Sequence, residues 1–344
     1  MATRLPLVED PEYRLNQLKT KVIFDEAQQL PPLFSILRSV VDNKRKQNGQ
    51  YVLLGSASPD LIKQISESLA GRISFLELTP FLFIEVFNHD PEYSPEILWL
   101  KGGYPDVFLM KNEIDRIDWF DSYCRTFIER DLSSMGIDIS SSLMRKLWTM
   151  LAHINANIWN ASQLASSLGI NYQTVNRYVD ILEKTYMIRI LQPYYRNIGK
   201  RLVKSPKVMF RDTGLLHYFL GIQTFEHLST HPARGASWEA FITEQLIGLF
   251  KLFKPGSRFY FWRTSGGAEV DLIVESEGKL IPFEIKLHSS PSKNMTKGIS
   301  TCMQDLNIDR GFILYPGKET YSLGNNIIAF PVNQLLTEFD SIFN

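Results

Sequence analysis

The sequence has few of the residues that mark secreted, zinc-binding or membrane proteins. It contains only two cysteines, Cys124 and Cys302, which are far apart and form no CxxC motif, so a disulfide framework and a zinc finger are excluded. Lys plus Arg and Asp plus Glu both number 37, so no global charge attracts nucleic acid or membrane. There is no signal-like apolar core and no run of about 18 apolar residues. We therefore expect a cytoplasmic protein with no membrane contact, whose binding depends on local patches.

The length of 344 residues suggests two or three domains of α/β class with a helical middle. Apolar runs alternate with helical patterns at both ends of the chain, and a polar, proline-containing linker (HDPEYSPE) leads into helices. The predicted regions are an incomplete parallel α/β unit, a helical region, a winged helix-turn-helix and a terminal α/β domain, at 1–88, 89–155, 156–211 and 212–344.

The first region predicts a parallel sheet with helical crossovers. Its strand-like runs lie at 22–24, 51–54 and 73–78, and its helical runs at 33–42 and about 59–69. Asp25 and Glu26 end the first strand, where a P-loop ATPase holds Mg²⁺ and orients the attacking water. The partner motif GxxxxGK[ST] is missing, since none of the three Gly-Lys pairs precedes Ser or Thr. The two acids are therefore either a functional pair or a polar strand end.

Several stretches in combination resemble a bacterial family of AAA-like ATP-binding proteins. They are DPEYRLNQL, KVIFDEAQQLPPLFSILRSVVD, YVLLGSAS, SESLAGRISFLELTPF, GGYPDV, YCRTFIERDL, RNIGKRLVKSPKVMFRDTGLL and FWRTSGGAEVDLIV, which together span nearly the whole chain. The resemblance implies that Asp25 and Glu26 are the Walker B acids. It also implies that Ser56 lies near the sensor position and that Arg72 stands where such ATPases can carry an arginine finger.

In that family a P-loop lies upstream of a segment like EDPEYR, so the resemblance implies that this chain begins after the first strand and the P-loop. We expect a truncation, or a missing piece supplied from another reading frame. ATP is the ligand that the family implies, but we expect neither tight ATP binding nor ATPase activity without a P-loop. A sheet that lacks its first strand exposes an unpaired edge, and we expect residues 1–88 to serve mainly as a scaffold.

The stretch NASQLASSLGINYQTVNRYVDILEKTYMIRILQPYY predicts a helix-turn-helix and a wing, with helices at 160–168 and 172–184. From Lys184 to Arg211 there are eight Lys or Arg and no acidic residue, which favours phosphate contacts. The alternative is a protein–protein module whose basic run contacts nucleotide or a neighbouring domain. Residues suited to nucleic acid in this region are Asn171, Gln173, Thr174, Asn176, Arg177, Arg196, Lys200, Arg201 and Lys204.

The terminal domain carries the clearest chemical pattern, GAEVDLIVESEGKLIPFEIK. Asp271 and Glu284 lie on successive predicted strands, and Lys286 shares a face with Glu284 because side chains alternate along a strand. Two carboxylates that bind Mg²⁺ or Mn²⁺, with a lysine to position water, suit phosphodiester hydrolysis. A surface hairpin with ordinary charges is the alternative. Further elements are expected as a helix at 237–253 and strands at 259–262, 270–274, 280–286, 312–315 and 327–330.

This D-x(n)-E-x-K pattern resembles the PD-(D/E)XK nuclease family, with Val270 in place of the proline. The resemblance implies a glutamate on the helix before the hairpin, for which Glu239 matches best and Glu244 second. The leading interpretation is a nucleic-acid-associated, AAA-like protein with a Mg²⁺- or Mn²⁺-dependent deoxyribonuclease site. Asp271 and Glu284 would be metal ligands, Lys286 the water-positioning group and Glu239 an accessory ligand or base.

The competing interpretation is a non-catalytic DNA- or protein-binding regulatory module, of toxin–antitoxin or defence type, with both sites silent. Under either interpretation we expect DNA as the main partner, with a second copy of the chain or another protein as a further partner. Divalent metal binding distinguishes the two, since only an intact cluster of acids should bind Mn²⁺.

Overall fold

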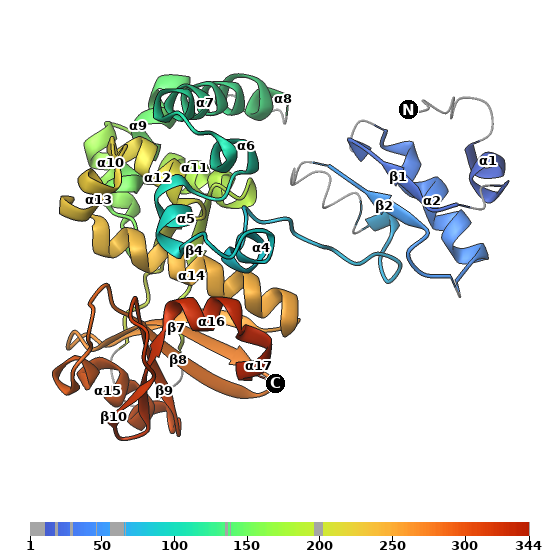
Figure 1. Ribbon diagram of the computed structural model, residues 1–344. Helices are drawn as coiled ribbons and strands as arrows, with labels where there is room; N and C mark the ends of the chain where they lie inside the picture. The colour runs from blue at the N-terminus through green and yellow to red at the C-terminus, as the bar shows by residue number, and fades with distance from the viewer. Residues whose placement is uncertain are drawn as a thin grey trace. The chain divides into compact units, whose positions relative to one another are not determined.

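The computed structural model describes residues 11–17, 20–27, 30–45, 47–55, 65, 67–134, 137, 139–195 and 202–343. The chain divides into two compact units, one comprising Met1–Leu78 with Lys184–Tyr186 and the other Thr79–Glu183 and Met187–Asn344 (Figure 1). The described residues form a mixed α/β protein with parallel and antiparallel strand pairs, in agreement with the expected α/β class. No helix in these ranges is both long and apolar enough to cross a membrane.

The first unit is a small two-stranded sheet covered on one face by helices. Strands β1 (Val22–Phe24) and β2 (Tyr51–Leu53) are parallel, as expected, with Ile23 the partner of Val52. Helices α1 (Pro11–Gln17) and α2 (Pro32–Asn43) contact each other, and the apolar face of α2 is buried in this unit's core. Side chains alternate along a strand, and those of Ile23 and Val52 are 66% and 43% exposed. The second face of the sheet is thus apolar and largely solvent-accessible.

The third strand expected at 73–78 is absent, and that prediction is wrong. Residues 73–79 have no regular secondary structure, and the side chains of Phe75, Leu76 and Leu78 are 63%, 84% and 83% exposed. A strand persists only where a neighbour satisfies its backbone groups, and the apolar pattern of this segment does not supply one. Of the helix predicted at about 59–69, residues 65, 67 and 68 are helical, and most of the rest lies outside the described residues.

The second unit contains a six-stranded sheet in the order β10-β11-β9-β8-β7-β6. Strands β6, β7 and β8 form an antiparallel meander, whereas β9 pairs parallel to both β8 and β11. All five strands predicted in this region are present, together with β10, which was not predicted from the sequence. The bounds are β6 (Arg258–Arg263), β7 (Glu269–Ser276), β8 (Lys279–Ile285), β9 (Gly311–Tyr315), β10 (Tyr321–Gly324) and β11 (Ile327–Pro331).

Helices cover both faces of this sheet (Figure 1). Helices α14 (Arg234–Phe253), α16 (Val332–Thr337) and α17 (Phe339–Phe343) share one apolar core with the sheet. Helix α15 (Lys297–Leu306), which follows a short 3-10 helix, packs against the sheet through a separate core. Because both faces are covered, most residues of β7 and β8 are buried, although both strands carry acidic side chains. A polar side chain on either strand therefore needs a specific partner.

The rest of the second unit is helical, with a three-stranded antiparallel sheet in the order β3-β5-β4. Helix α10 ends at Gly169, whose φ of 67° is the left-handed conformation that glycine adopts readily. The helical bounds predicted around this turn agree with the structure. The elements are α4 (Phe83–His89), α5 (Pro95–Lys101), α6 (Pro105–Leu109), α7 (Glu113–Thr126), a π-helix (Phe127–Asp131), α8 (Leu132–Ser134), α9 (Ser141–His153), β3 (Asn157–Ile158), α10 (Ala161–Leu168), α11 (Tyr172–Lys184), β4 (Ile188–Leu191), β5 (Lys207–Phe210), α12 (Thr213–Leu220) and α13 (Phe225–Thr230).

Helix α4 belongs to the second unit, so the boundary predicted at 88 is too late in the chain. Phe83 and Val86 are buried in the core that α14 shares. The backbone N–H of Phe83 donates to Oε1 of Gln245 on α14, with 2.6 Å between the atoms. These contacts explain why the compact units divide after Leu78.

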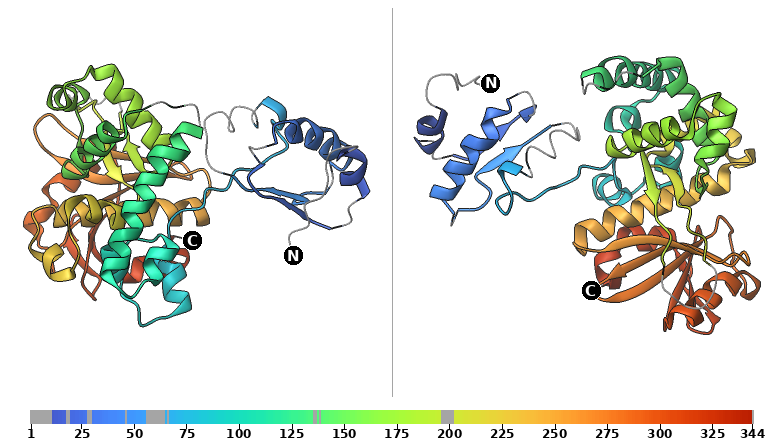
Figure 2. Two further views of the ribbon diagram at one scale, coloured as in Figure 1. Left: turned by 90° about the horizontal axis from the view of Figure 1, so that it is seen from above. Right: turned by 180° about the vertical axis from the view of Figure 1, so that it is seen from behind.

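The connection between β4 and β5 runs along the edge strand β6. The N–H of Phe261 donates to the carbonyl of Gln192 at 3.1 Å, and the N–H of Tyr194 donates back to Phe261 at 2.6 Å. On the return, the N–H of Val203 donates to the carbonyl of Arg263 at 3.0 Å. Backbone groups on an exposed sheet edge would otherwise face water or another chain. Main-chain hydrogen bonds therefore join the segment that leaves and re-enters the three-stranded sheet to the six-stranded sheet, and Figure 2 shows the two sheets in further views.

Candidate active site

Asp271 and Glu284 are brought opposite each other by a tight hairpin turn. The two residues that join β7 to β8, at 277–278, have positive φ values of 51° and 76°, as a two-residue hairpin turn requires. The register set by this turn pairs Leu272 with Phe283. The next positions in that register are Asp271 and Glu284, so the two carboxylates occupy adjacent strands at the same level.

Both carboxylates are buried, with 6% exposure for Asp271 and 7% for Glu284. Oδ2 of Asp271 accepts a hydrogen bond from the N–H of Ile285 at 2.8 Å. Lys286 donates to Oε1 of Glu284 at 2.5 Å, whereas Oε2 of Glu284 has no hydrogen-bond partner among the described residues. A buried carboxylate oxygen without a partner is energetically costly, so this oxygen is suited to accept a water or a cation.

Two residues of the site, Lys207 and Glu269, were not predicted from the sequence. The ammonium of Lys207 lies 2.7 Å from Oε1 of Glu239, 2.6 Å from Oε1 of Glu269 and 3.8 Å from Oδ1 of Asp271. Its side chain is only 2% exposed. Sequence reasoning assigned Lys207 to a basic wing. Two sequence features could have pointed to these ion pairs. Lys207 directly precedes the apolar run VMF, which favours a buried strand, and Glu269 lies two residues before Asp271, on the same face of its strand.

The charges at this site shift the pKa values of the residues that carry them. Burial, followed by the negative charge of Asp271, raises the pKa of Glu239 and of Glu284 well above the usual range. Burial alone would lower the pKa of Lys207, but the charges of Glu239, Asp271 and Glu269 outweigh burial and raise it. Lys286 behaves in the same way beside Glu284. The cluster therefore keeps its lysines charged and favours any further cation.

Of the two helical glutamates considered, the structure brings Glu239 to the cluster and Glu244 to a different place. Glu244 lies further along α14, where both of its oxygens bind the guanidinium of Arg189, with 2.8 Å from Nη2 to Oε2. Arg211 lies 3.4 Å from the same Oε2. The four residues proposed for catalysis from sequence thus gather in one region, with Glu239 linked to Asp271 through Lys207.

Among the described residues, no three Asp, Glu, His or Cys side chains are arranged to hold a common metal ion. The donors that fit a hard divalent cation are the carboxylates of Asp271 and Glu284, one with an open oxygen. A metal at this site would therefore depend on these two residues, with water completing its coordination. Cys302, on the nearby helix α15, is a buried free thiol whose pKa burial raises, which makes it a poor ligand.

The residues predicted to bind nucleic acid have several different roles. Oδ1 of Asn171 accepts from the N–H of Thr174 at 2.7 Å and from its hydroxyl at 2.9 Å, which caps the start of α11. Gln173, Asn176 and Arg177 are exposed on that helix. The exposed face of α11 therefore keeps three polar side chains available at its surface, while Asn171 and Thr174 shape the start of the helix.

The basic residues that follow α11 do not all face solvent, because some form ion pairs inside the unit and another is exposed. Arg189, Lys207 and Arg211 face acids of α14 and β7 and are used inside the unit. Lys204 is exposed, with Nζ 5.9 Å from the ring centre of Tyr195. Predicted nucleic-acid contacts that lie outside the described residues are Arg196, Lys200 and Arg201.

The predicted nucleotide residues lie in the first unit. Asp25 and Glu26 are exposed directly after β1, and the N–H of Glu26 donates to Oδ1 of Asp25 at 3.1 Å. Arg72 forms a two-point contact with Asp42 at the end of α2, with Nε–Oδ1 2.7 Å and Nη2–Oδ2 2.8 Å. Ser56 lies outside the described residues. The structure thus places the two acids together and pairs Arg72 with a residue of its own unit.

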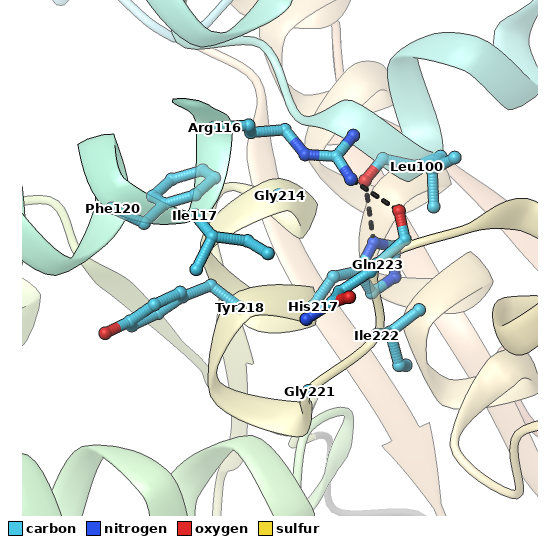
Figure 3. Close-up of a pocket in the computed structure, with 10 residues that line it drawn as sticks. All are labelled: Leu100, Arg116, Ile117, Phe120, Gly214, His217, Tyr218, Gly221, Ile222 and Gln223. Carbon is cyan, nitrogen blue, oxygen red and sulfur yellow. Dashed lines mark hydrogen bonds between the residues drawn. The ribbon is translucent and has the colours of Figure 1, made fainter. Parts of the chain in front are cut away.

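A separate cavity of about 70 Å³ lies between α7 and α12 in the helical part (Figure 3). Arg116 donates to the carbonyl of Gln223 at 2.5 Å. His217 points its Nδ1 at the carbonyl of Leu100, 2.9 Å away. No carboxylate side chain lines this cavity among the described residues. The cavity is therefore separate from the acidic site of Asp271 and Glu284.

Three family models match consecutive stretches of the chain. An AAA domain matches residues 5–87, and two domains of unknown function, DUF8612 and DUF4143, match 95–226 and 234–335. One solved structure, protein VC1899 from Vibrio cholerae, aligns over 97% of this chain and 94% of its own at 9% identity. The TM-score of this alignment is 0.22, which is too low to indicate a shared fold.

Two curated relatives are uncharacterized proteins of Mycobacterium tuberculosis and Mycobacterium bovis. Each is 41% identical over 336 residues, which is 98% of this chain and 73% of the relative. The AAA-like membership that the motifs implied is confirmed, with a terminal domain of unknown function. The chain belongs to the family of AAA-domain proteins that includes these two mycobacterial proteins.

Proposed function

We propose that the cluster of Asp271, Glu284 and Lys286 hydrolyses phosphodiester bonds of DNA with the help of Mg²⁺ or Mn²⁺. The observation that carries this proposal is the state of Glu284, which is buried opposite Asp271, bound by Lys286 on one oxygen and unpartnered on the other. Mg²⁺ and Mn²⁺ prefer carboxylate oxygens, and a buried oxygen that lacks a partner is stabilised by a cation. The residues present therefore fit the metal that the proposal requires.

Each residue has a distinct role in the proposed reaction. Asp271 and Glu284 would hold the metal, which when bound polarises a phosphate oxygen and lowers the pKa of a bound water. The N–H of Ile285 fixes the orientation of Asp271 through the 2.8 Å bond to Oδ2. Lys286 keeps a positive charge beside Glu284, where it positions a water and stabilises charge on the phosphate.

Two further observations support this proposal, the first on the site and the second on DNA as the substrate. The helix before the hairpin contributes Glu239 to the cluster, as the resemblance to PD-(D/E)XK nucleases implied. The exposed residues Gln173, Asn176 and Arg177 of α11 offer groups that pair with base edges and phosphates. We assign this face of α11 to substrate binding within the same proposal.

The test compares DNA cleavage by the purified full chain with cleavage by matched variants in Mg²⁺ and in Mn²⁺. Asp271→Asn should reduce the rate by about 100-fold or more, since it removes a charge on which metal binding depends. Lys286→Met should reduce the rate by about 10- to 100-fold. Glu275→Gln, on the same strand but paired with Arg258 outside the cluster, should leave the rate unchanged. Cleavage that persists in Asp271→Asn would mean that the activity belongs to another site or to a contaminant.

A non-catalytic binding module is the second candidate, and one observation favours it. Lys207, Arg189 and Arg211 use acids of α14 to hold the parts of the second unit together, so some of the acidic side chains have a structural role. A module of this kind would bind DNA or protein through α11 without any need for metal. A folded chain that binds DNA but shows no Mn²⁺ binding would favour this candidate over the nuclease.

A further inference from the structure

We infer that the ammonium of Lys207 takes the place of a second cation, so that the acidic site binds one divalent ion per chain. The inference builds on the proposed function, because it concerns the metal at that same site. It predicts a number of bound ions, which is measured independently of catalysis.

The first argument is the position of the Lys207 ammonium. It lies within 4 Å of Glu239, Glu269 and Asp271, at 2.7, 2.6 and 3.8 Å. The charges of these three carboxylates are thus balanced by a cation that belongs to the protein itself. In two-metal phosphodiesterase sites the second ion lies about 3.5–4 Å from the first, within one group of acids. The volume among these three acids is here filled by a side chain of the protein.

The second argument is the location of the remaining acceptor. The ion pairs of Lys207 in the described part of the chain do not include Glu284. Oε2 of Glu284 is the one oxygen of the cluster that is buried without a hydrogen-bond partner among the described residues. One place for a divalent ion therefore remains, on the side of the cluster formed by Glu284 and Asp271.

The third argument is the balance of charge. Together with the residues around Lys207, the site has four carboxylates, namely Glu239, Glu269, Asp271 and Glu284. It has three cations, namely Lys207, Lys286 and Arg263, the last of which lies 3.2 Å from Glu269. With all groups ionised, the sum is one negative charge. One divalent ion would reverse the sign and attract a phosphodiester, whereas a second would crowd like charges in a buried place.

The fourth argument is that Lys207 is held firmly by the structure. It starts β5, whose neighbour Val208 accepts a hydrogen bond from the N–H of Ala156 at 2.8 Å. Its Nζ also lies 5.5 Å from the ring centre of Phe261 on β6, a cation–π arrangement. A charge fixed by two sheets cannot exchange with ions from solution. The β3-β5-β4 sheet thus supplies a permanent cation to a site on the six-stranded sheet.

The experiment counts Mn²⁺ ions bound to the full chain by electron paramagnetic resonance of the free ion, with calorimetry as a second readout. The wild type should bind one ion, and Lys207→Arg, which keeps the charge, should also bind one. Lys207→Met, which keeps the length and removes the charge, should bind two. Mn²⁺ should also raise the thermal midpoint of Lys207→Met more than that of the wild type, because two bound ions stabilise the native state more than one.

Two ions, or none, bound to the wild type would overturn the inference, and this count does not depend on whether any variant folds. One ion bound to folded Lys207→Met would overturn it as well. DNA cleavage measured in the same samples separates the two proposals. One bound ion without cleavage supports the inference and contradicts the proposed function. Cleavage by a wild type that binds two ions supports the proposed function and contradicts the inference.

Discussion

Ser237 of α14 donates a hydrogen bond to Nε2 of His217 on α12, with 2.7 Å between the atoms. The direction follows from the other ring nitrogen, since Nδ1 lies 2.9 Å from the carbonyl of Leu100, which can only accept. The indole of Trp99 in turn donates to the Ser237 hydroxyl at 2.9 Å. This chain of bonds links α5, α12 and α14 and holds His217 as a neutral, buried imidazole.

His217 should therefore make the second unit sensitive to acid. Its pKa is lowered from 6.5 to about 4, mainly by burial and in smaller part by Arg116 and His231, whereas the hydrogen bond with the Leu100 carbonyl opposes the shift. The unfolded chain takes up the proton first, so this stabilisation is complete above about pH 6.5 and is lost as the pH falls towards 4. The full effect is on the order of 3 kcal/mol. Urea unfolding at several pH values measures it.

The control for this prediction is His217→Gln, which cannot titrate. It should be less stable than the wild type at neutral pH and should lose less stability on acidification. Parallel pH profiles for the two proteins would show that other groups cause the acid sensitivity.

Two glycines in helices should respond in opposite ways to alanine. A Cβ on Gly214 of α12 would lie 2.0 Å from the carbonyl oxygen of Lys101, so α5 and α12 would have to separate. Gly214→Ala should cost about 3 kcal/mol of unfolding free energy. Gly235, on α14, has no atom within 4 Å of an added Cβ, and Gly235→Ala should be neutral or stabilising by about 0.5 kcal/mol. A stable Gly214→Ala would show that the helices approach less closely than described.

Binding of duplex DNA by the full chain should depend on salt and on Arg177. Affinity should fall steeply between about 50 and 200 mM salt, because phosphate contacts release counterions. Arg177→Gln should weaken binding and reduce the salt dependence by about one phosphate contact. Arg125→Gln is the matched control, since Arg125 is also an exposed arginine on a helix but lies on α7. Equal loss in both variants would contradict a specific role for α11.

Mg²⁺-ATP should leave the thermal midpoint of this chain unchanged, and Asp25→Ala should behave like the wild type. The sequence contains no GxxxxGK[ST] motif to hold the phosphates, and Arg72 is already bound to Asp42. Ligand binding to the native state would raise the midpoint. A rise that Asp25→Ala abolishes would show that the end of β1 serves a nucleotide site whose phosphates other residues hold.

Sequence patterns predicted the hairpin of the site well, because local signals determine it. The apolar runs VDLIV and LIPFEIK flank Glu277-Gly278, so both the turn and the adjacent positions of Asp271 and Glu284 follow from residues close in sequence. The same holds for α11, where apolar residues recur with helical period.

The role of Lys207 could not be predicted in this way. Its partners Glu239 and Asp271 are distant in sequence and lie on other elements, and a lysine within a basic run resembles a surface residue. The strand expected at 73–78 failed for a related reason. Its apolar alternation is a local property, but a strand also needs a neighbour from elsewhere in the chain.

The hydrogen bonds between the β4–β5 connection and β6 have a consequence for the exchange of domains by recombination. A recombination event that exchanged the chain after Arg211 would set the new terminal sheet against a connecting segment and a lysine from the other parent. The edge contacts of β6 and the charge of Lys207 would stay matched to the transferred domain if the segment from Gln192 to Lys207 moved with it. The smallest exchangeable piece of this protein therefore begins inside the region that the sequence presents as a separate winged helix.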